Sequence, residues 1–183
     1  GVKLMGIFSY KDLDEVKQLE VYEVDKEVNE VLNKTFEEFK KFYLGEVFNY
    51  GEDLYVSFDE DKVVGTIGVI TKEIPIKGEA FITELYINKD FLDYTSKEYG
   101  EHIINGLLNK AVQICENHKA EVITLGFKPK LSYLEGYVSN LGFNKTHEAI
   151  IMKYAKENKD KEINLNSIEL EPLKEENLVE FME

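Results

Sequence analysis

The sequence predicts an α/β protein (α+β in some classifications) in which helices cover both faces of a mixed, mostly antiparallel central sheet. Two β-rich runs flank a short polar turn at residues 54–70, and a third run follows at 79–87. A long amphipathic helix pattern at 97–118 comes next, and then a short apolar run, AEVITLGF, at 120–127. A meander followed by a crossover helix and a further strand requires both antiparallel and parallel pairing, which is the basis of this prediction.

The first part of the chain is predicted to form a strand and two helices. Residues 2–10 have strand character, and Leu13, Val16 and Leu19 recur at helical spacing within 11–24. A second helix is predicted before Gly45 and the polar cluster NYGED, which is typical of a chain turn. Its apolar stripe consists of Leu32, Phe36, Phe39 and Tyr43.

The rest of the domain is predicted from a hairpin, a crossover and a closing helix. The segment DLYVSFDEDKVVGTIGVI is a hairpin with its turn at DEDK, and GEAFITELYI is the next strand. The crossover helix begins near Lys97 and buries Cys115 at core spacing with Ile104, Leu108 and Ala111. A short helix in KLSYLEGYVSNLGF ends at Gly142, a residue suited to a left-handed cap, and NKTHEAIIMKYAK is predicted to be one last strand.

Composition excludes several function classes. The 183 residues carry a net charge of −14, and all 22 basic residues are lysines, so the surface is unsuited to nucleic acid. The acidity either serves solubility alone or attracts cationic small molecules such as amines. No apolar run is long enough for a membrane span, and the single cysteine favours a reducing, cytoplasmic setting. His118 and His147 lack ligand spacing, so no metal site is predicted.

Domain boundaries follow from a change in composition near residue 155. Residues 1–155 are predicted to form one domain, 156–166 a polar linker, and 167–183 a tail. The segments SYKDLDEVKQL and PLKEENLVEFM share a weak repeat, so the tail either begins a second similar domain or packs as an ordinary extension.

One candidate binding feature is the start of the crossover helix. Gly100 stands at a strand-to-helix turn and Lys97 lies three residues before it. Unpaired amides and the positive end of the helix dipole favour an anion such as a diphosphate, although an ordinary helix start has the same residues.

Three segments together resemble the GNAT acetyltransferase family over roughly residues 2–154: the hairpin LYVSFDEDKVVGTIGVI, the unit ELYINKDFLDYTSKEYGEHIINGLLNKAVQICE, and the closing YLEGYVSNLGF. The resemblance implies acetyl-CoA as cofactor. It assigns the pantetheine contact to the strand end Leu85, Tyr86 and Ile87, and the diphosphate contact to Lys97, Glu98, Tyr99, Gly100, Glu101 and His102. Lys97 stands where the family has Gln or Arg, and His102 where it has Gly or Ala.

Acid and base candidates come from residue types and their positions. Strand alternation puts Glu84 on one face with Ile82 and Tyr86, where apolar neighbours suit a base, although an exposed edge position is an equal alternative. The family's acid is often a Tyr four residues before the glycine of Leu-Gly-Phe. Val138 holds that position here, so the candidate is Tyr137, with Tyr133 as a packing residue one turn earlier.

The resemblance therefore implies a cytoplasmic N-acetyltransferase (a transferase and acyltransferase) that passes an acetyl group from acetyl-CoA to a small amine by direct attack. A catalytically degenerate GNAT-like domain that binds coenzyme A or acts as a scaffold in a tandem protein is the alternative. An unrelated α/β binding domain with the same order of elements is a third reading. A homodimer is compatible with all three.

Overall fold

The computed structural model describes residues 3–28, 34–89, 97–126, 128–140, 142–145 and 151–155. The strands are β1 (Gly6–Ser9), β2 (Leu54–Asp59), β3 (Lys62–Ile70), β4 (Glu79–Ile87), β5 (Val122–Gly126), β6 (Asn144–Lys145) and β7 (Ile151–Ala155). The helices are α1 (Glu15–Val28), α2 (Phe36–Tyr43), α3 (Ile74–Lys77), α5 (Lys97–Asn117) and α6 (Glu135–Asn140). Short 3-10 turns are η1 (Tyr10–Asp12), η2 (Glu46–Phe48) and η3 (Pro129–Leu134). The predicted linker and tail lie outside the described residues.

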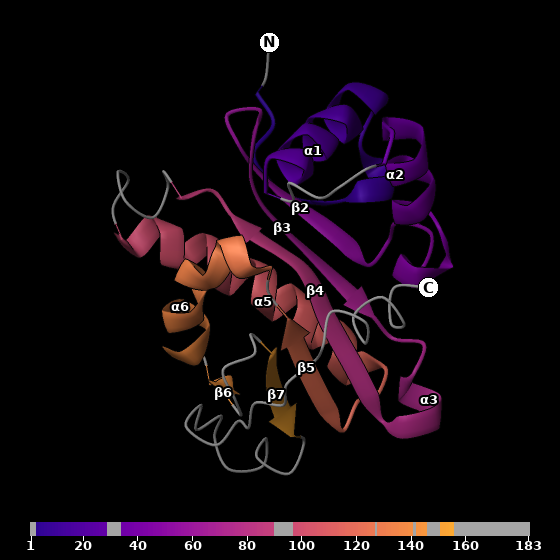
Figure 1. Ribbon diagram of the computed structural model, residues 1–183, viewed down its shortest axis with the longest axis vertical. Helices are drawn as coiled ribbons and strands as arrows, with labels where there is room; N and C mark the ends of the chain where they lie inside the picture. Colours follow the sequence, from indigo (N-terminus) through magenta and orange to yellow (C-terminus); the bar gives the residue numbers. More distant parts are fainter. Residues whose placement is uncertain are drawn as a thin grey trace.

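A mixed sheet runs through the described part of the chain in the order β1-β2-β3-β4-β5-β7-β6 (Figure 1). Strands β1 to β4 are antiparallel to one another, β4 and β5 are parallel, and β5, β7 and β6 are again antiparallel. Helix α5 makes the crossover between β4 and β5, so the predicted meander followed by a crossover is confirmed. The last strand is a correction, because residues 144–155 contribute two paired strands rather than one.

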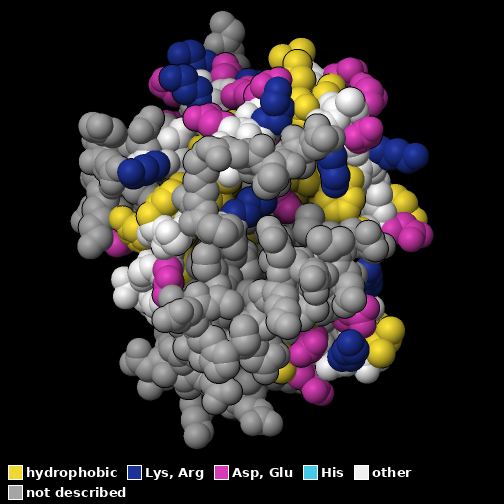
Figure 2. All heavy atoms as spheres, viewed as in Figure 1, with side chains coloured by type: hydrophobic (Ala, Val, Ile, Leu, Met, Phe, Trp, Pro, Cys, Tyr) yellow, Lys and Arg dark blue, Asp and Glu magenta, His cyan; other side chains and the backbone are white. Residues whose placement is uncertain are grey.

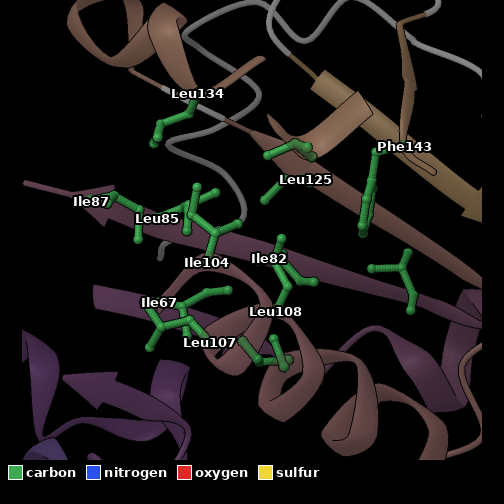
Figure 3. Packing of buried hydrophobic residues seen from close by; sticks show 14 of the residues in the cluster. Ile67, Ile82, Leu85, Ile87, Ile104, Leu107, Leu108, Leu125, Leu134 and Phe143 are labelled. Atoms are coloured by element: carbon green, nitrogen blue, oxygen red, sulfur yellow. The ribbon is translucent and has the colours of Figure 1, made fainter. Parts of the chain in front are cut away.

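Helices cover both faces of the sheet, as predicted. On one face, α5 and the α6 region pack against β3, β4 and β5 around Ile67, Leu85, Leu107 and Leu125 (Figure 3). On the other face, α1 and α2 enclose an aromatic cluster with β2 and β3. The aromatic rings of that cluster belong to Phe8, Tyr10, Tyr22, Phe36, Phe39, Phe42, Tyr43, Phe48, Phe58 and Phe81. Two separate apolar cores on the two faces therefore fix the sheet in the middle of the domain.

Helix α1 exists where it was predicted, but it presents a different face to the core. Val16 and Leu19 are 73% and 41% exposed, whereas Gln18, Val21 and Tyr22 are buried. Leu13 lies before the helix, so its position cannot set the helical phase. The buried amide of Gln18 donates to the Tyr10 carbonyl at 3.3 Å, which makes a polar side chain acceptable in the core.

Helices α2 and α5 agree with the sequence prediction, whereas α3 was not predicted and the predicted closing helix is divided into η3 and α6. Thr35 and Glu38 form a capping box that starts α2, and Phe39 and Tyr43 are buried on its predicted stripe, while Leu32 lies outside the described residues. Cys115 is buried in α5, and burial raises the pKa of its thiol to about 12, so it is a core residue as predicted. Gly142 has a φ of 103° and follows α6 as the left-handed residue expected there.

Within the described ranges, no helix is long and apolar enough to cross a membrane. Those same ranges contain no group of three or more His, Cys, Asp or Glu side chains that could hold a metal ion.

Candidate active site

An opening in the sheet defines the candidate site. The parallel ladder between β4 and β5 ends at the pair Ile82 and Leu125, whereas β4 continues to Ile87. At the far end of β4, the Tyr133 hydroxyl from η3 donates to the Ile87 carbonyl at 2.6 Å. The stretch of β4 that was assigned to a pantetheine arm, Leu85 to Ile87, therefore lies beyond the last paired residue of β5.

The start of α5 lies at the same side of the molecule. Figure 1 shows α5 beginning on the side toward which β4 points. Gly100 is buried, Glu101 is half-buried and His102 is exposed. The backbone of Lys97, Glu98 and Tyr99 is helical, while their side chains lie outside the described part of the structure. His102 therefore lies on the exposed side of α5, whereas Gly100 lies on its buried side.

A β-bulge in β4 sets the position of Glu84. Thr66 of β3 pairs with Tyr86, and Gly68 pairs with Thr83, so Glu84 and Leu85 share one position on the partner strand. Glu84 has a φ of 54°, a left-handed conformation that costs a non-glycine residue roughly 1–2 kcal/mol. The Thr66 hydroxyl donates to the Glu84 carbonyl at 2.6 Å and holds the bulge in place.

The bulge corrects the predicted orientation of Glu84. Simple alternation would place Glu84 on the face of Ile82, which belongs to the core under α5. Instead, its carboxylate reaches the opposite core and accepts a hydrogen bond from the Tyr43 hydroxyl at 2.7 Å. Glu84 is 9% exposed, so the alternative of an exposed edge residue is wrong.

Three other side chains surround the Glu84 carboxylate. The Lys128 ammonium, from the segment after β5, lies 3.6 Å from Glu84 Oε2 and 2.8 Å from Asp25 Oδ1. Asp25 comes from α1 and Tyr43 from α2. Two carboxylates, one ammonium and one phenol from four separate segments thus meet at the bulge.

Burial and charge perturb this group of side chains. Burial raises the pKa of the Asp25 carboxyl to about 6, the negative charge of Glu84 adds to that rise, and Lys128 opposes it. Burial works against the Lys128 ammonium, but Glu84 and Asp25 outweigh this effect and raise its pKa. Burial and Glu84 also raise the pKa of Tyr43 well above its usual value, so Tyr43 acts as a hydrogen-bond donor. Perturbed titratable groups that gather beside an opening are typical of functional sites.

The candidate acid is less well matched. Tyr137 is half-buried on α6 and packs against the core under α5. Val138, which holds the position of the family's tyrosine, is completely buried. Tyr133 is more than a packing residue, since its hydroxyl is bound to the end of β4. The role of Tyr137 as acid remains a prediction.

Sequence reasoning identified Glu84 but missed Asp25, Tyr43 and Lys128. Tyr43 was predicted to belong to the apolar stripe of the second helix. Its hydroxyl is the polar group on that stripe, and it could have indicated that Tyr43 contacts a polar partner. Asp25 is one of many acidic residues on α1, and Lys128 follows a strand whose end is not marked by the sequence pattern. Their meeting depends on long-range packing, with Lys128 and Asp25 separated by 103 positions.

The mixed charge of the site also appears on the surface. Figure 2 shows lysine and carboxylate side chains interspersed over the described part of one face. The net charge of −14 is therefore not gathered into one acidic patch in this view.

Comparisons with known proteins give the fold. No protein-family model matches the sequence, and no curated protein sequence matches it significantly. Among solved structures, a chimera of spermidine N-acetyltransferase SpeG from Vibrio cholerae and hSSAT has a TM-score of 0.58 at 15% identity, covering 86% of this chain and 99% of its own. A GNAT-family acetyltransferase from Staphylococcus aureus has a TM-score of 0.57 at 16% identity, with coverages of 84% and 99%.

A third similar structure is a ribosomal-protein alanine N-acetyltransferase from Escherichia coli, with a TM-score of 0.52, 15% identity and coverages of 81% and 92%. At these identities the likeness concerns the fold. The chain therefore has the fold of GNAT acetyltransferases, and it spans nearly the whole length of the structures it resembles.

Proposed function

We propose that the protein is a cytoplasmic, acetyl-CoA-dependent N-acetyltransferase of the GNAT family that transfers an acetyl group to a small amine by direct attack. The observation that carries the proposal is the buried Glu84 carboxylate, which a β-bulge holds where β4 extends beyond β5. The GNAT fold of the chain supports the reaction type. The amine class follows from the carboxylates at the site.

The residues present fit a nucleotide thioester in two respects. The edge of β4 from Leu85 to Ile87 extends past the last β5 pair, so an extended ligand would lie alongside this part of the strand. Lys97, the first residue of α5, is a candidate cation for a diphosphate at the first turn of that helix. When bound there, acetyl-CoA would supply the acetyl group as an activated thioester.

The chain's own residues supply proton transfer and orientation. An amine acceptor arrives mainly as an ammonium ion and must lose a proton before it can attack. Glu84, or a water molecule that it orders, is the base, and backbone amides polarise the carbonyl under attack. Tyr43 donates to Glu84 and fixes the direction of its carboxylate. Tyr137 is the candidate acid that protonates the leaving thiolate.

Calorimetry and a substitution test this function together. Isothermal titration should detect acetyl-CoA binding, and the absence of binding near millimolar concentration would remove the proposal. Glu84→Gln should lower amine-dependent thiol release by roughly 10²- to 10⁴-fold, the usual contribution of a general base, while acetyl-CoA binding persists. Glu79→Gln on the same strand is the matched control and should retain activity.

A second function, a coenzyme A-binding domain without catalysis, is favoured by one specific observation. The family's tyrosine position is the buried Val138, and the Tyr133 hydroxyl is bound to the Ile87 carbonyl. A panel of polyamines, amino acids and aminoglycosides distinguishes the two functions. Tight acetyl-CoA binding without thiol release for any acceptor would favour the non-catalytic domain.

A further inference from the structure

Lys128 connects two carboxylates that come from different elements, Asp25 of α1 and Glu84 of β4. Its ammonium donates to Asp25 Oδ1 at 2.8 Å and lies 3.6 Å from Glu84 Oε2. The side chains are 30%, 13% and 5% exposed for Lys128, Asp25 and Glu84 respectively. All three are therefore largely shielded from water, where charge interactions are stronger than on the surface.

The three charges depend on one another. Without a cation between them, two carboxylates in a shielded site cannot both stay ionised near neutral pH, and one of them takes up a proton. Lys128 supplies that cation. Asp25 makes the shorter of its two contacts and so keeps the ammonium beside Glu84.

We propose that Lys128 and Asp25 are positioning residues for the base, with Lys128 holding the Glu84 carboxylate by charge attraction and Asp25 holding Lys128 at its side. The assignment of Glu84 as base rests on the proposed function, whereas the charge coupling rests on the observed contacts. Burial and the negative charge of Glu84 raise the pKa of Asp25, and Lys128 lowers it. These opposite effects of Glu84 and Lys128 agree with the coupling.

Other groups face the cluster from the neighbouring elements. Tyr43 of α2 donates to Glu84 and stays protonated because its pKa is raised well above the usual value. Lys34, which precedes α2, lowers the pKa of Asp25 from a greater distance, and Tyr10 of η1 interacts with Tyr43. Thr66 of β3 contributes an uncharged hydroxyl.

The first experiment measures the coupling without coenzyme. In the full chain labelled with ¹³C-carboxyl aspartate, NMR titration should give an Asp25 pKa of about 6. Lys128→Met should raise that midpoint by roughly 1 unit or more, and Glu84→Gln should lower it, because an attractive and a repulsive charge are removed respectively. Lys128→Arg keeps the charge and should stay within about half a unit. A midpoint that neither Lys128→Met nor Glu84→Gln moves would overturn the proposal.

The second experiment asks whether the coupling reaches the reaction. Lys128→Met should shift the acidic limb of the kcat–pH profile to higher pH, and Asp25→Asn, which removes the carboxylate that holds Lys128 beside Glu84, should shift it in the same direction by a smaller amount, with KM for the amine little changed. A shift of about one unit corresponds to an approximately tenfold change in rate on that limb. Lys128→Arg should restore the profile, which a purely structural role would not require. An Asp25→Asn profile that coincides with the wild type, or that shifts to lower pH, would contradict the proposal.

The two experiments separate the proposal from the function on which it rests. Coupled titration with no turnover for any amine would remove the proposed enzyme but leave the charge cluster. Turnover with an uncoupled Asp25 would remove the positioning roles and leave the enzyme. If Lys128→Met fails to fold, as judged by its circular dichroism, the Glu84→Gln titration still decides the coupling.

Discussion

Two buried tyrosines next to the site allow a sharp test of the Glu84 contact. Tyr10 and Tyr43 pack edge to face with their ring centroids 5.3 Å apart. The Tyr43 hydroxyl donates to Glu84 at 2.7 Å, whereas the Tyr10 hydroxyl is buried with no hydrogen-bond partner among the described residues. The same chemical change, Tyr to Phe, should therefore have opposite effects at two neighbouring positions.

The magnitudes follow from the state of each hydroxyl. Tyr43→Phe removes a buried hydrogen bond to a charged group, and we expect it to lower the free energy of unfolding by about 2 kcal/mol. For a chain of this length the melting temperature should fall by roughly 4–8 °C. Tyr10→Phe removes a buried hydroxyl that gains nothing in the folded state, so it should be neutral or stabilising by about 1 kcal/mol.

Urea unfolding and thermal melts of both variants at pH 7 measure these effects. The difference between the variants matters more than either absolute value, because the rings, their burial and their neighbours are shared. Equal stability of Tyr43→Phe and Tyr10→Phe would refute the claim that the contact with Glu84 stabilises the fold. Tyr43→Phe should also lower turnover, since Glu84 loses the donor that directs it, while Tyr10→Phe should leave turnover within about twofold.

Three further predictions concern the packing, the pH dependence and the anion site. Gly65→Ala should lower the free energy of unfolding by roughly 1–3 kcal/mol, because the added Cβ would lie 2.8 Å from Leu107 Cδ1 and 3.0 Å from the Tyr86 carbonyl oxygen. Gly136→Ala is the control: its Cβ would have no atom within 4 Å, so it should be neutral or stabilising. Urea unfolding measures both variants. The pKa of Asp25 is about 6 in the folded protein and 3.8 ordinarily, so between these values the folded state binds a proton that the unfolded state does not. The stability that Asp25 contributes therefore falls as the pH rises from about 4 to about 6. Asp25→Asn should therefore gain roughly 3 kcal/mol relative to the wild type between pH 4 and pH 7, and a constant difference across that range would contradict the linkage. Lys97→Met should weaken acetyl-CoA binding several-fold in calorimetry and reduce its salt dependence. Lys77→Met, in α3 just before the start of β4, should change neither.

The fold could be predicted because its elements have strong periodicities. The hairpin at β2 and β3, the crossover helix α5 and the parallel strand β5 each follow from patterns that span many residues. The phase of α1 could not be predicted in the same way, since a buried Gln18 and an exposed Val16 reverse the usual ranking of side chains. Packing against η1 decides that helix's orientation, and no local pattern contains this information.

The site was predictable only in part for the same reason. A glutamate in a strand that precedes a Gly- and Lys-containing helix start indicates a base beside an anion site. The bulge that redirects Glu84 depends on the pairing between β3 and β4, and its partners come from α1, α2 and the segment after β5. Residues so far apart in the chain meet only through tertiary packing, and the spacing of neighbouring residues in a single sequence does not show which of them will meet.

The bulge is the feature that makes a buried carboxylate possible at this place in the sheet. In a regular strand Glu84 would project with Ile82 into an apolar core, where an unpaired carboxylate is strongly disfavoured. The extra residue turns it toward Tyr43 and Lys128, which satisfy its charge, and Thr66 anchors the displaced carbonyl. The left-handed φ of 54° is a cost that structural packing alone does not require, since a glycine would adopt it without strain. A glutamate retained in such a conformation is better explained by the work of its side chain than by the stability of the strand.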